Sequence, residues 1–207
     1  MREQASSGKR SSPASGYPSL SYPERSQFDL VGIDNRRAGY TITAHLLGCG
    51  CRRVMFLGRA GSAPTVDARI AGYCEALEQA SGEREPIVCR INPEEKEQVK
   101  AALAKAHPDG IVCANDFTAA QLLKTLTELG VAVPAKMRLA GIDDVKYASL
   151  VSVPLTTIHQ PCTQIGATAV QAMIQRIENP TMPSRDIFVN FHLVVRQSSG
   201  AGNGSKS

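Results

Sequence analysis

Four polar residues lie where predicted strands of this sequence give way to helices. Asp34 follows the apolar stretch "DLVGI", Asn115 follows "GIVCA" and Asp143 follows "RLAGI". Arg69 falls in the first turns of the helix that comes after "VMFLG". In an open parallel sheet, ligands bind outside the carboxyl ends of the strands. The pattern therefore predicts that these four side chains line one rim of a sheet.

These residue types suit recognition better than catalysis. Carboxylates accept hydrogen bonds from vicinal hydroxyls or ring N–H groups, an amide both donates and accepts, and a guanidinium offers a planar fork of donors. The set fits a sugar or a nucleobase-like solute. The sequence contains no G-x-S-x-G elbow, no H-E-x-x-H pair and no GxxxxGK[ST] phosphate loop. We expect a binding site with no catalytic residue, no metal and no cofactor.

Each of these residues also has a purely structural interpretation, because short polar residues after strands commonly cap the following helix. Asn115 and Asp143 are each followed by an aspartate, Asp116 and Asp144. One residue suffices as a cap, so we expect Asp116 and Asp144 to cap and their neighbours to face outward. Arg69 opposes the helix macrodipole, which a carboxylate or a bound ligand would offset.

Other residues that are able to take part in binding or catalysis are weaker candidates for the site. The stretch "PLTTIHQP" places His159 and Gln160 at a strand end, and we expect Gln160, ahead of His159, to line the pocket. A metal-dependent hydrolase using Asp143 and Asp144 is an alternative, although adjacent residues on a strand point in opposite directions. The six cysteines lack C-x-x-C spacing, which predicts buried reduced thiols and leaves zinc or redox chemistry at 49–51 as the alternative.

The four residues must be positioned by strands and helices, which the sequence pattern predicts in alternation. Strands are predicted near residues 28–33, 52–58, 86–91, 110–114 and 137–142. Helices are predicted between them, over residues 36–50, 65–80, 93–107 and 116–130. This serial order predicts an α/β fold with parallel sheets and flanking helices. A last helix is expected over 163–177, and "RDIFVNFHLVVR" at 185–196 alternates like one final strand.

Composition narrows the class of protein. A length of 207 residues with 43% hydrophobic residues allows one sizeable core or two small ones. The net charge of +4 is spread along the chain, so DNA binding by this chain itself is not indicated. No apolar run approaches the roughly 20 residues of a membrane span, and no secretory signal is evident, so we expect a cytoplasmic location. Residues 1–27 and 198–207 are rich in small and polar residues and are expected to be disordered.

Several stretches resemble the effector-binding domain of the LacI/GalR family of transcription regulators. They keep that family's order and approximate spacing, and are "IDNRRAG", "DARIAGYCEAL", "PDGIVCAND", "GIDD" and "PLTTIHQP". The resemblance covers roughly residues 28–200. It implies a periplasmic-binding-protein-like fold of two subdomains with a sugar or a nucleoside-like or purine-like effector between them. It also implies that Asp34, Arg69, Asn115 and Asp143 contact the effector.

The sequence departs from that family at its start, where a helix-turn-helix and the first strands and helices of the N-terminal subdomain are absent. The resemblance thus implies a remnant of that subdomain, residues 28–51 and 159–180. It implies a complete C-terminal subdomain, residues 52–158 and 181–197. With one wall of the cleft missing, we expect weak or no effector binding and an uncovered apolar face on the helix Ala38–Leu47.

The resemblance also implies partners. Family members are dimers, so a homodimer is expected, and operator DNA would be bound only through the missing N-terminal module. The helix Phe117–Leu129 carries an apolar stripe that either pairs with a second copy or forms core. The stripe consists of Ala119, Leu122, Leu123 and Leu126. A solute-binding protein of a sugar transporter, which shares the fold, is the alternative function.

Overall fold

The computed structural model describes residues 28–61, 63–80 and 85–201. The disorder expected for residues 1–27 concerns a segment outside the described residues. A disordered tail was expected over residues 198–207, and this expectation is wrong for residues 198–201. Ser198 and Ser199 are fully buried, and the Ser198 hydroxyl donates to the Leu139 carbonyl at 2.6 Å. These residues belong to the fold because their hydroxyls satisfy backbone groups of the sheet.

The described elements alternate along most of the chain. The strands are β1 (Leu30–Gly32), β2 (Val54–Gly58), β3 (Ile87–Arg90), β4 (Gly110–Cys113), β5 (Arg138–Asp143), β6 (Thr156–His159), β7 (Asp186–Phe188) and β8 (His192–Val194). The helices are α1 (Asn35–Gly48), α2 (Pro64–Gln79), α3 (Lys96–Ala106), α4 (Asp116–Glu128) and α5 (Cys162–Glu178), with 3-10 turns η1 (Lys146–Ser149) and η2 (Gln197–Ser199). None of the described helices is both long enough and apolar enough to cross a bilayer.

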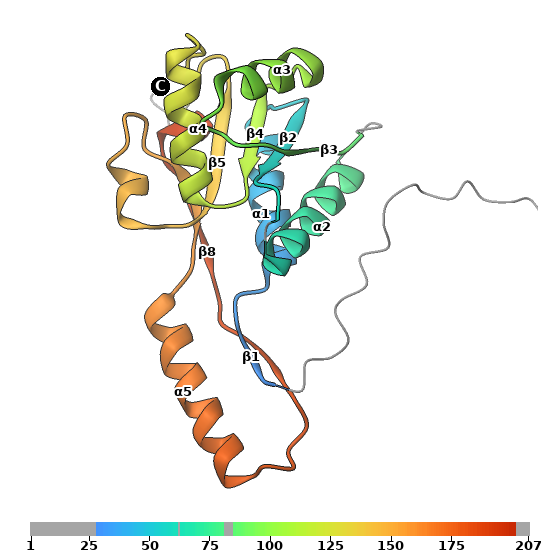
Figure 1. Cartoon of the computed structure of the whole chain (residues 1–207), viewed down its shortest axis with the longest axis vertical. Helices are drawn as coiled ribbons and strands as arrows, with labels where there is room; N and C mark the ends of the chain where they lie inside the picture. The colour runs from blue at the N-terminus through green and yellow to red at the C-terminus, as the bar shows by residue number, and fades with distance from the viewer. Residues whose placement is uncertain (1–27, 62, 81–84, 202–207) are drawn as a thin grey trace, which may run out of the picture.

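The main sheet has six strands in the order β3-β2-β4-β5-β6-β8. Its first five strands are parallel, and β8 runs antiparallel to β6 along one edge. A second sheet consists only of β1 and β7, which are parallel. The predicted α/β fold with parallel sheets is therefore confirmed. We call the main sheet with α1 to α4 the large unit, and β1, β7 and α5 the small unit (Figure 1).

Side-chain alternation along the buried strands builds two cores in the large unit. On β2, Phe56 faces the core formed with α1 and α2, whereas Met55 and Leu57 face the core formed with α3 and α4. Successive strand residues point to opposite faces, so a strand covered on both sides is apolar throughout. The stripe on α4 lies wholly in the second core, which supports the core interpretation of those four residues.

Helix α1 lies against α2 at unusually close range. A Cβ placed on Gly39 would come within 2.0 Å of the Arg69 carbonyl oxygen, and one on Gly72 within 1.8 Å of the Arg36 carbonyl oxygen. Only glycine allows backbones to approach this closely. The expected boundary at residue 51 therefore does not match the packing, because α1 belongs to the large unit. The expected uncovered face of Ala38–Leu47 is also wrong, since its apolar residues Ala38, Ile42 and Leu46 are fully buried.

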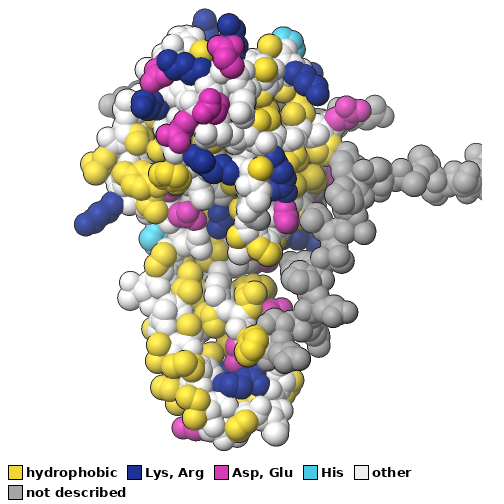
Figure 2. Space-filling model, in the orientation of Figure 1, with side chains coloured by type: hydrophobic (Ala, Val, Ile, Leu, Met, Phe, Trp, Pro, Cys, Tyr) yellow, Lys and Arg dark blue, Asp and Glu magenta, His cyan; other side chains and the backbone are white. Residues whose placement is uncertain are grey.

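The small unit is sparsely packed by comparison. Of the 17 residues of α5, Ala172 alone is buried. Figure 2 shows apolar side chains gathered at this end of the molecule, and those exposed on α5 are Val170, Met173, Ile174 and Ile177. The single strand expected over 185–196 is instead two strands, β7 paired with β1 and β8 paired with β6. The segment changes partners because it crosses from the small unit to the large one.

Candidate ligand-binding site

The buried Arg69 guanidinium is the centre of the candidate site. Its Nε donates to Asn35 Oδ1 at 2.8 Å, and its Nη1 donates to the Ala114 carbonyl at 2.6 Å. Its Nη2 lies 3.6 Å from Asp143 Oδ1. The close crossing of α1 and α2 brings Asn35 within reach of Arg69. Burial lowers the pKa of Arg69, and the carboxylates of Asp143 and Asp116 oppose that shift.

Asp143 and Gln160 complete this cluster, as expected from their positions at the ends of β5 and β6. Gln160 Nε2 donates to Asp143 Oδ1 at 2.5 Å. Burial raises the pKa of Asp143, while Arg69 and the hydrogen bond from Gln160 lower it. Arg69, Asp143 and Gln160 therefore form one polar cluster at the carboxyl edge of the sheet, with Arg69 buried and the other two side chains partly exposed.

The backbone at the end of β5 is strained. Asp143 has φ +133° and Asp144 has φ +57°, values that non-glycine residues rarely adopt. Such conformations cost on the order of 1–3 kcal/mol each and persist where surrounding contacts hold them. The two carboxylates lie in different environments, one in the Arg69 cluster and one against Arg196 and His159.

Two side chains, Arg196 and His159, hold the carboxylate of Asp144. Its Oδ1 accepts from Arg196 Nη2 at 2.6 Å, and its Oδ2 lies 2.8 Å from His159 Nδ1. Burial raises its pKa, but the hydrogen bonds from Arg196 and His159 outweigh burial and lower it. The expectation that Asp144 caps the following turn is wrong, because its carboxylate is committed to these neighbours. His159 is likewise held away from the Arg69 cluster.

Asp116 lies beneath the site as a fully buried carboxylate. It accepts from Thr157 Oγ1 at 2.7 Å and from the Val145 amide at 3.1 Å. A Cβ on Gly141 would lie 2.2 Å from Asp116 Oδ1, so the glycine before "IDD" makes room for this group. Burial raises its pKa to about 6 against the effect of the two hydrogen bonds. Asp116 therefore ties the loop after β5 to β6 and α4.

Asp34 and Asn115 serve as helix caps. Asp34 Oδ1 accepts from the Arg37 amide, and Asn115 Oδ1 accepts from the Thr118 amide, both at 2.9 Å. Asn115 rather than Asp116 therefore caps α4, which reverses the expected division of roles. Within the described residues, the Asn115 amide nitrogen donates no hydrogen bond. That nitrogen is left available to a ligand, whereas the contribution of Asp34 is limited to its second oxygen.

Asn35 is the residue that sequence reasoning missed. It orients Arg69 and also donates from Nδ2 to the Ile33 carbonyl at 3.3 Å. Its position directly after Asp34 in "IDN" was the available signal. The sequence pattern could not show the crossing of α1 over α2 that gives Asn35 its partner.

No metal centre forms among the described residues, because no three His, Cys, Asp or Glu side chains there converge suitably. All six cysteines are free thiols. Cys51 and Cys113 are buried as expected, but Cys162 is exposed, so burial does not hold for every cysteine. Burial raises the pKa of Cys51 to about 11, which keeps this thiol protonated and unreactive at neutral pH.

Comparison with known proteins assigns this fold to a family. The family of periplasmic binding protein-like domains matches residues 43–199. A ribose operon repressor of Halalkalibacterium halodurans is 28% identical over 181 residues, which are 86% of this chain and 54% of that protein. The repressor PurR of Photobacterium profundum is 30% identical over 186 residues, which are 85% of this chain and 54% of that protein. The chain thus spans about half the length of these curated relatives.

Solved structures give the same result. A LacI family regulator from Enterococcus faecium with bound ribose superposes with a TM-score of 0.72 at 25% identity, covering 86% of this chain and 68% of that one. The regulator CelR in complex with cellobiose superposes with a TM-score of 0.74 at 26% identity, covering 83% and 54%. The chain belongs to the family of periplasmic binding protein-like domains, in the form that LacI-family transcriptional regulators carry.

Proposed function

We propose that this chain is the ligand-sensing part of a LacI-type transcriptional regulator and that its effector is a sugar or a nucleoside-like or purine-like molecule. The observation that carries the proposal is the Arg69–Asp143–Gln160 cluster at the carboxyl edge of a parallel sheet. Fixed donors and acceptors of this kind match vicinal hydroxyls or ring N–H groups. The relatives bound to ribose and cellobiose support the sugar class.

In this proposal each site residue has a distinct role. Asp143 accepts hydrogen bonds from the effector, Arg69 and Gln160 donate to it, and the free amide nitrogen of Asn115 adds one more donor. Asp34 contributes through its second carboxylate oxygen. The positive charge of Arg69 is neutralised by Asp143, so the site favours a neutral effector over an anionic one.

We further propose that binding changes the affinity for operator DNA of a helix-turn-helix module encoded outside these 207 residues, in the cytoplasm. Regulators among the relatives favour this role over that of a solute-binding protein of a transporter. A homodimer is part of the proposal. Phe117 near the start of α4 and Leu150 directly after η1 are exposed apolar side chains of the large unit, and we propose that a second copy covers them. Sedimentation velocity tests this surface by comparing Leu150→Asp with the unchanged chain, and we expect a smaller dimer fraction in the variant. An unchanged dimer fraction would contradict the proposal that this surface forms the dimer.

The effector site is tested by titration followed by nuclear magnetic resonance. Because the small unit supplies only part of the opposite wall, we expect millimolar affinity for ribose, cellobiose or a purine nucleoside, with amide shifts centred on Arg69, Asp143 and Gln160. Asp143→Asn keeps the size of the side chain but removes the charge-assisted acceptor and is expected to weaken binding about tenfold. Asp67→Asn, an exposed carboxylate on α2 paired with Arg90, is the matched control.

Three results would contradict the proposal. Shifts confined to another surface would place the site elsewhere. Equal weakening by both substitutions would show that general charge, not Asp143, decides binding. Micromolar affinity would contradict the expectation that the incomplete opposite wall makes binding weak.

A further inference from the structure

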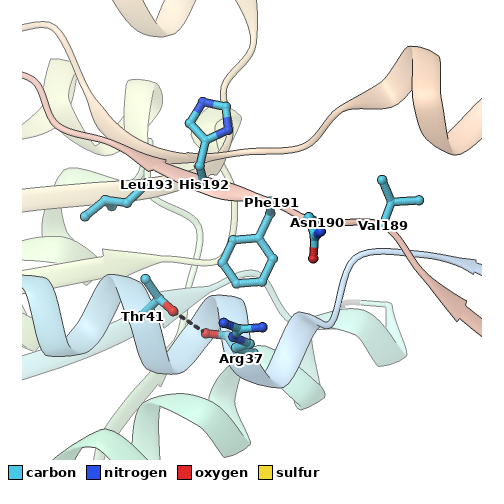
Figure 3. Close-up of a pocket in the computed structure, with 7 residues that line it drawn as sticks. All are labelled: Arg37, Thr41, Val189, Asn190, Phe191, His192 and Leu193. Atoms are coloured by element: carbon cyan, nitrogen blue, oxygen red, sulfur yellow. Dashed lines mark hydrogen bonds between the residues drawn. The ribbon is translucent and has the colours of Figure 1, made fainter.

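A hollow lies between α1 and the segment that returns from the small unit to the large one. It has a volume of about 420 Å³, within the range of small-molecule sites. It is lined by Arg37, Thr41, Val189, Asn190, Phe191, His192 and Leu193. The hollow shares no residue with the Arg69 cluster. Figure 3 shows Phe191 and Asn190 pointing toward α1, whereas His192 points to the other side of the strand.

Two neighbouring arginines on α1 have different partners. Arg36 Nε lies 2.9 Å from Glu75 Oε2 and so forms an ion pair with α2. Arg37 makes no ion pair within the described part of the chain, and its guanidinium carbon lies 5.9 Å from the centre of the Phe191 ring. The exposed guanidinium therefore lines the hollow, and its hydrogen-bond donors are not taken up by any described residue. A planar cation with free donors is a recognition group for carboxylate or phosphate.

The other walls add donors, an acceptor and an apolar floor. The Asn190 amide is exposed and makes no hydrogen bond with any described residue, so its NH₂ can donate to an anion. Thr41 Oγ1 donates to the Arg37 carbonyl at 2.8 Å, which leaves its lone pairs for a ligand hydroxyl. Phe191 is partly buried against the core formed with α1 and α2, and its ring, over which Arg37 lies, supplies an apolar wall. Helix α1 carries no carboxylate, and its N-cap Asp34 accepts from the Arg37 amide through Oδ1.

We propose that this hollow binds a small organic anion, a phosphate ester or a carboxylate carried on a ring. The anionic group lies on Arg37 and Asn190, and the ring lies against Phe191. Residues 189–191 join β7 of the small unit to β8 of the large one. A ligand that bridges α1 and this crossing segment therefore fixes the two units relative to each other. The proposal does not depend on the effector site, with which the hollow shares no lining residue.

Phenyl phosphate, inorganic phosphate and phenol separate the parts of the proposal in titrations of the full chain. We expect phenyl phosphate to bind, with amide shifts at Thr41, Asn190 and Phe191, and to bind more tightly than either fragment. Arg37→Gln is expected to weaken binding about tenfold, because it removes the charge-assisted donors. Arg36→Gln, the matched control, is expected to change affinity less than about twofold. Both side chains are exposed, so neither substitution is expected to impair folding.

Each remaining outcome overturns a stated part. If inorganic phosphate binds as tightly as phenyl phosphate, the ring has no role in binding. If phenol binds as tightly as phenyl phosphate, the anionic group has no role in binding. Equal losses in Arg36→Gln and Arg37→Gln show attraction to general positive charge rather than a site. Absence of any shift at about 10 mM phenyl phosphate, a concentration that detects even millimolar binding, overturns the proposal as a whole.

Discussion

The large and small units of this chain use their apolar residues in opposite ways. In the large unit, β2 and β4 are buried along their whole length between two helical layers. In the small unit, two three-residue strands and α5 leave most of their apolar side chains exposed. Burial of apolar area is the dominant stabilising term of folding. The large unit therefore has a core of its own, while the small unit has almost none.

Ion pairs provide part of the stabilisation in the small unit, where apolar burial is small. Asp29 Oδ1 accepts from Arg176 Nη2 at 2.5 Å, and its Oδ2 accepts from Arg185 Nη2 at 3.0 Å. The Arg185 amide also donates to Asp29. These bonds join the start of β1, the end of α5 and the start of β7, which are far apart in the sequence. The comparison teaches that the small unit is fastened by polar contacts, whereas the large unit is held by its cores.

The largest expected effect compares equivalent truncations in the two units. Leu122→Ala, in the core between α4 and the sheet, is expected to lower the free energy of unfolding by about 2–5 kcal/mol. Ile177→Ala, on α5 where the side chain is 70% exposed, is expected to change it by less than about 0.5 kcal/mol. Urea denaturation of both variants measures this difference. Similar losses in the two variants would show that the face of α5 is covered in solution.

The next largest effect is a pH response centred in the large unit. The pKa of Asp116 is about 6 in the folded chain, above its ordinary value of 3.8. The folded state therefore binds this proton more readily, and Asp116 makes stability rise as pH falls from about 6 to about 4. The gain is at most about 3 kcal/mol. The free energy of unfolding is measured across this pH range for the unchanged chain and for Asp116→Asn. The difference between the two at each pH gives the contribution of Asp116. A difference that does not vary with pH would contradict a raised pKa.

The smallest and most local effect concerns the small unit. Hydrogen bonds from Arg185 and Arg176 hold the pKa of Asp29 well below its ordinary value. A lowered pKa means that its stabilising contribution is present above about pH 4 and is lost as pH falls further. Asp29→Ala is expected to speed amide hydrogen exchange in α5 and β7 while leaving β4 protected. Asp186→Ala, an exposed carboxylate of β7, is the control, and equal acceleration by both variants would count against the ion cluster.

Much of the fold could be predicted because it follows from local patterns. Apolar runs of four to six residues, separated by helical periodicity, located the strands and helices of the large unit, and serial βαβ order implied parallel pairing. Packing between elements could not be predicted in the same way. The expected unit 28–51 was assigned from the family resemblance. Its helix α1 joins the large unit because Gly39 and Gly72 allow it to lie directly on α2.

The candidate site shows the same division. The strand-end positions of Asp143 and Gln160, and the unusual cation at Arg69, were visible in the sequence, and the structure brings these three side chains together. The capping roles predicted for Asp116 and Asp144 were wrong. A pair of neighbouring polar residues does not reveal which member caps and which is buried. That choice depends on the partners that other elements supply, such as Thr157 for Asp116.

The sequence by itself determined the alternation of elements, the identity of the buried strands and the edge of the sheet where polar groups gather. These properties depend on side-chain periodicity and on backbone preferences, which act over a few residues. Tertiary structure alone decided that Asn35 orients Arg69, that Asp143 and Asp144 face different partners, and that Arg37 faces a hollow while Arg36 forms an ion pair. These properties depend on contacts between residues distant in the chain, and such contacts exist only after the elements have packed.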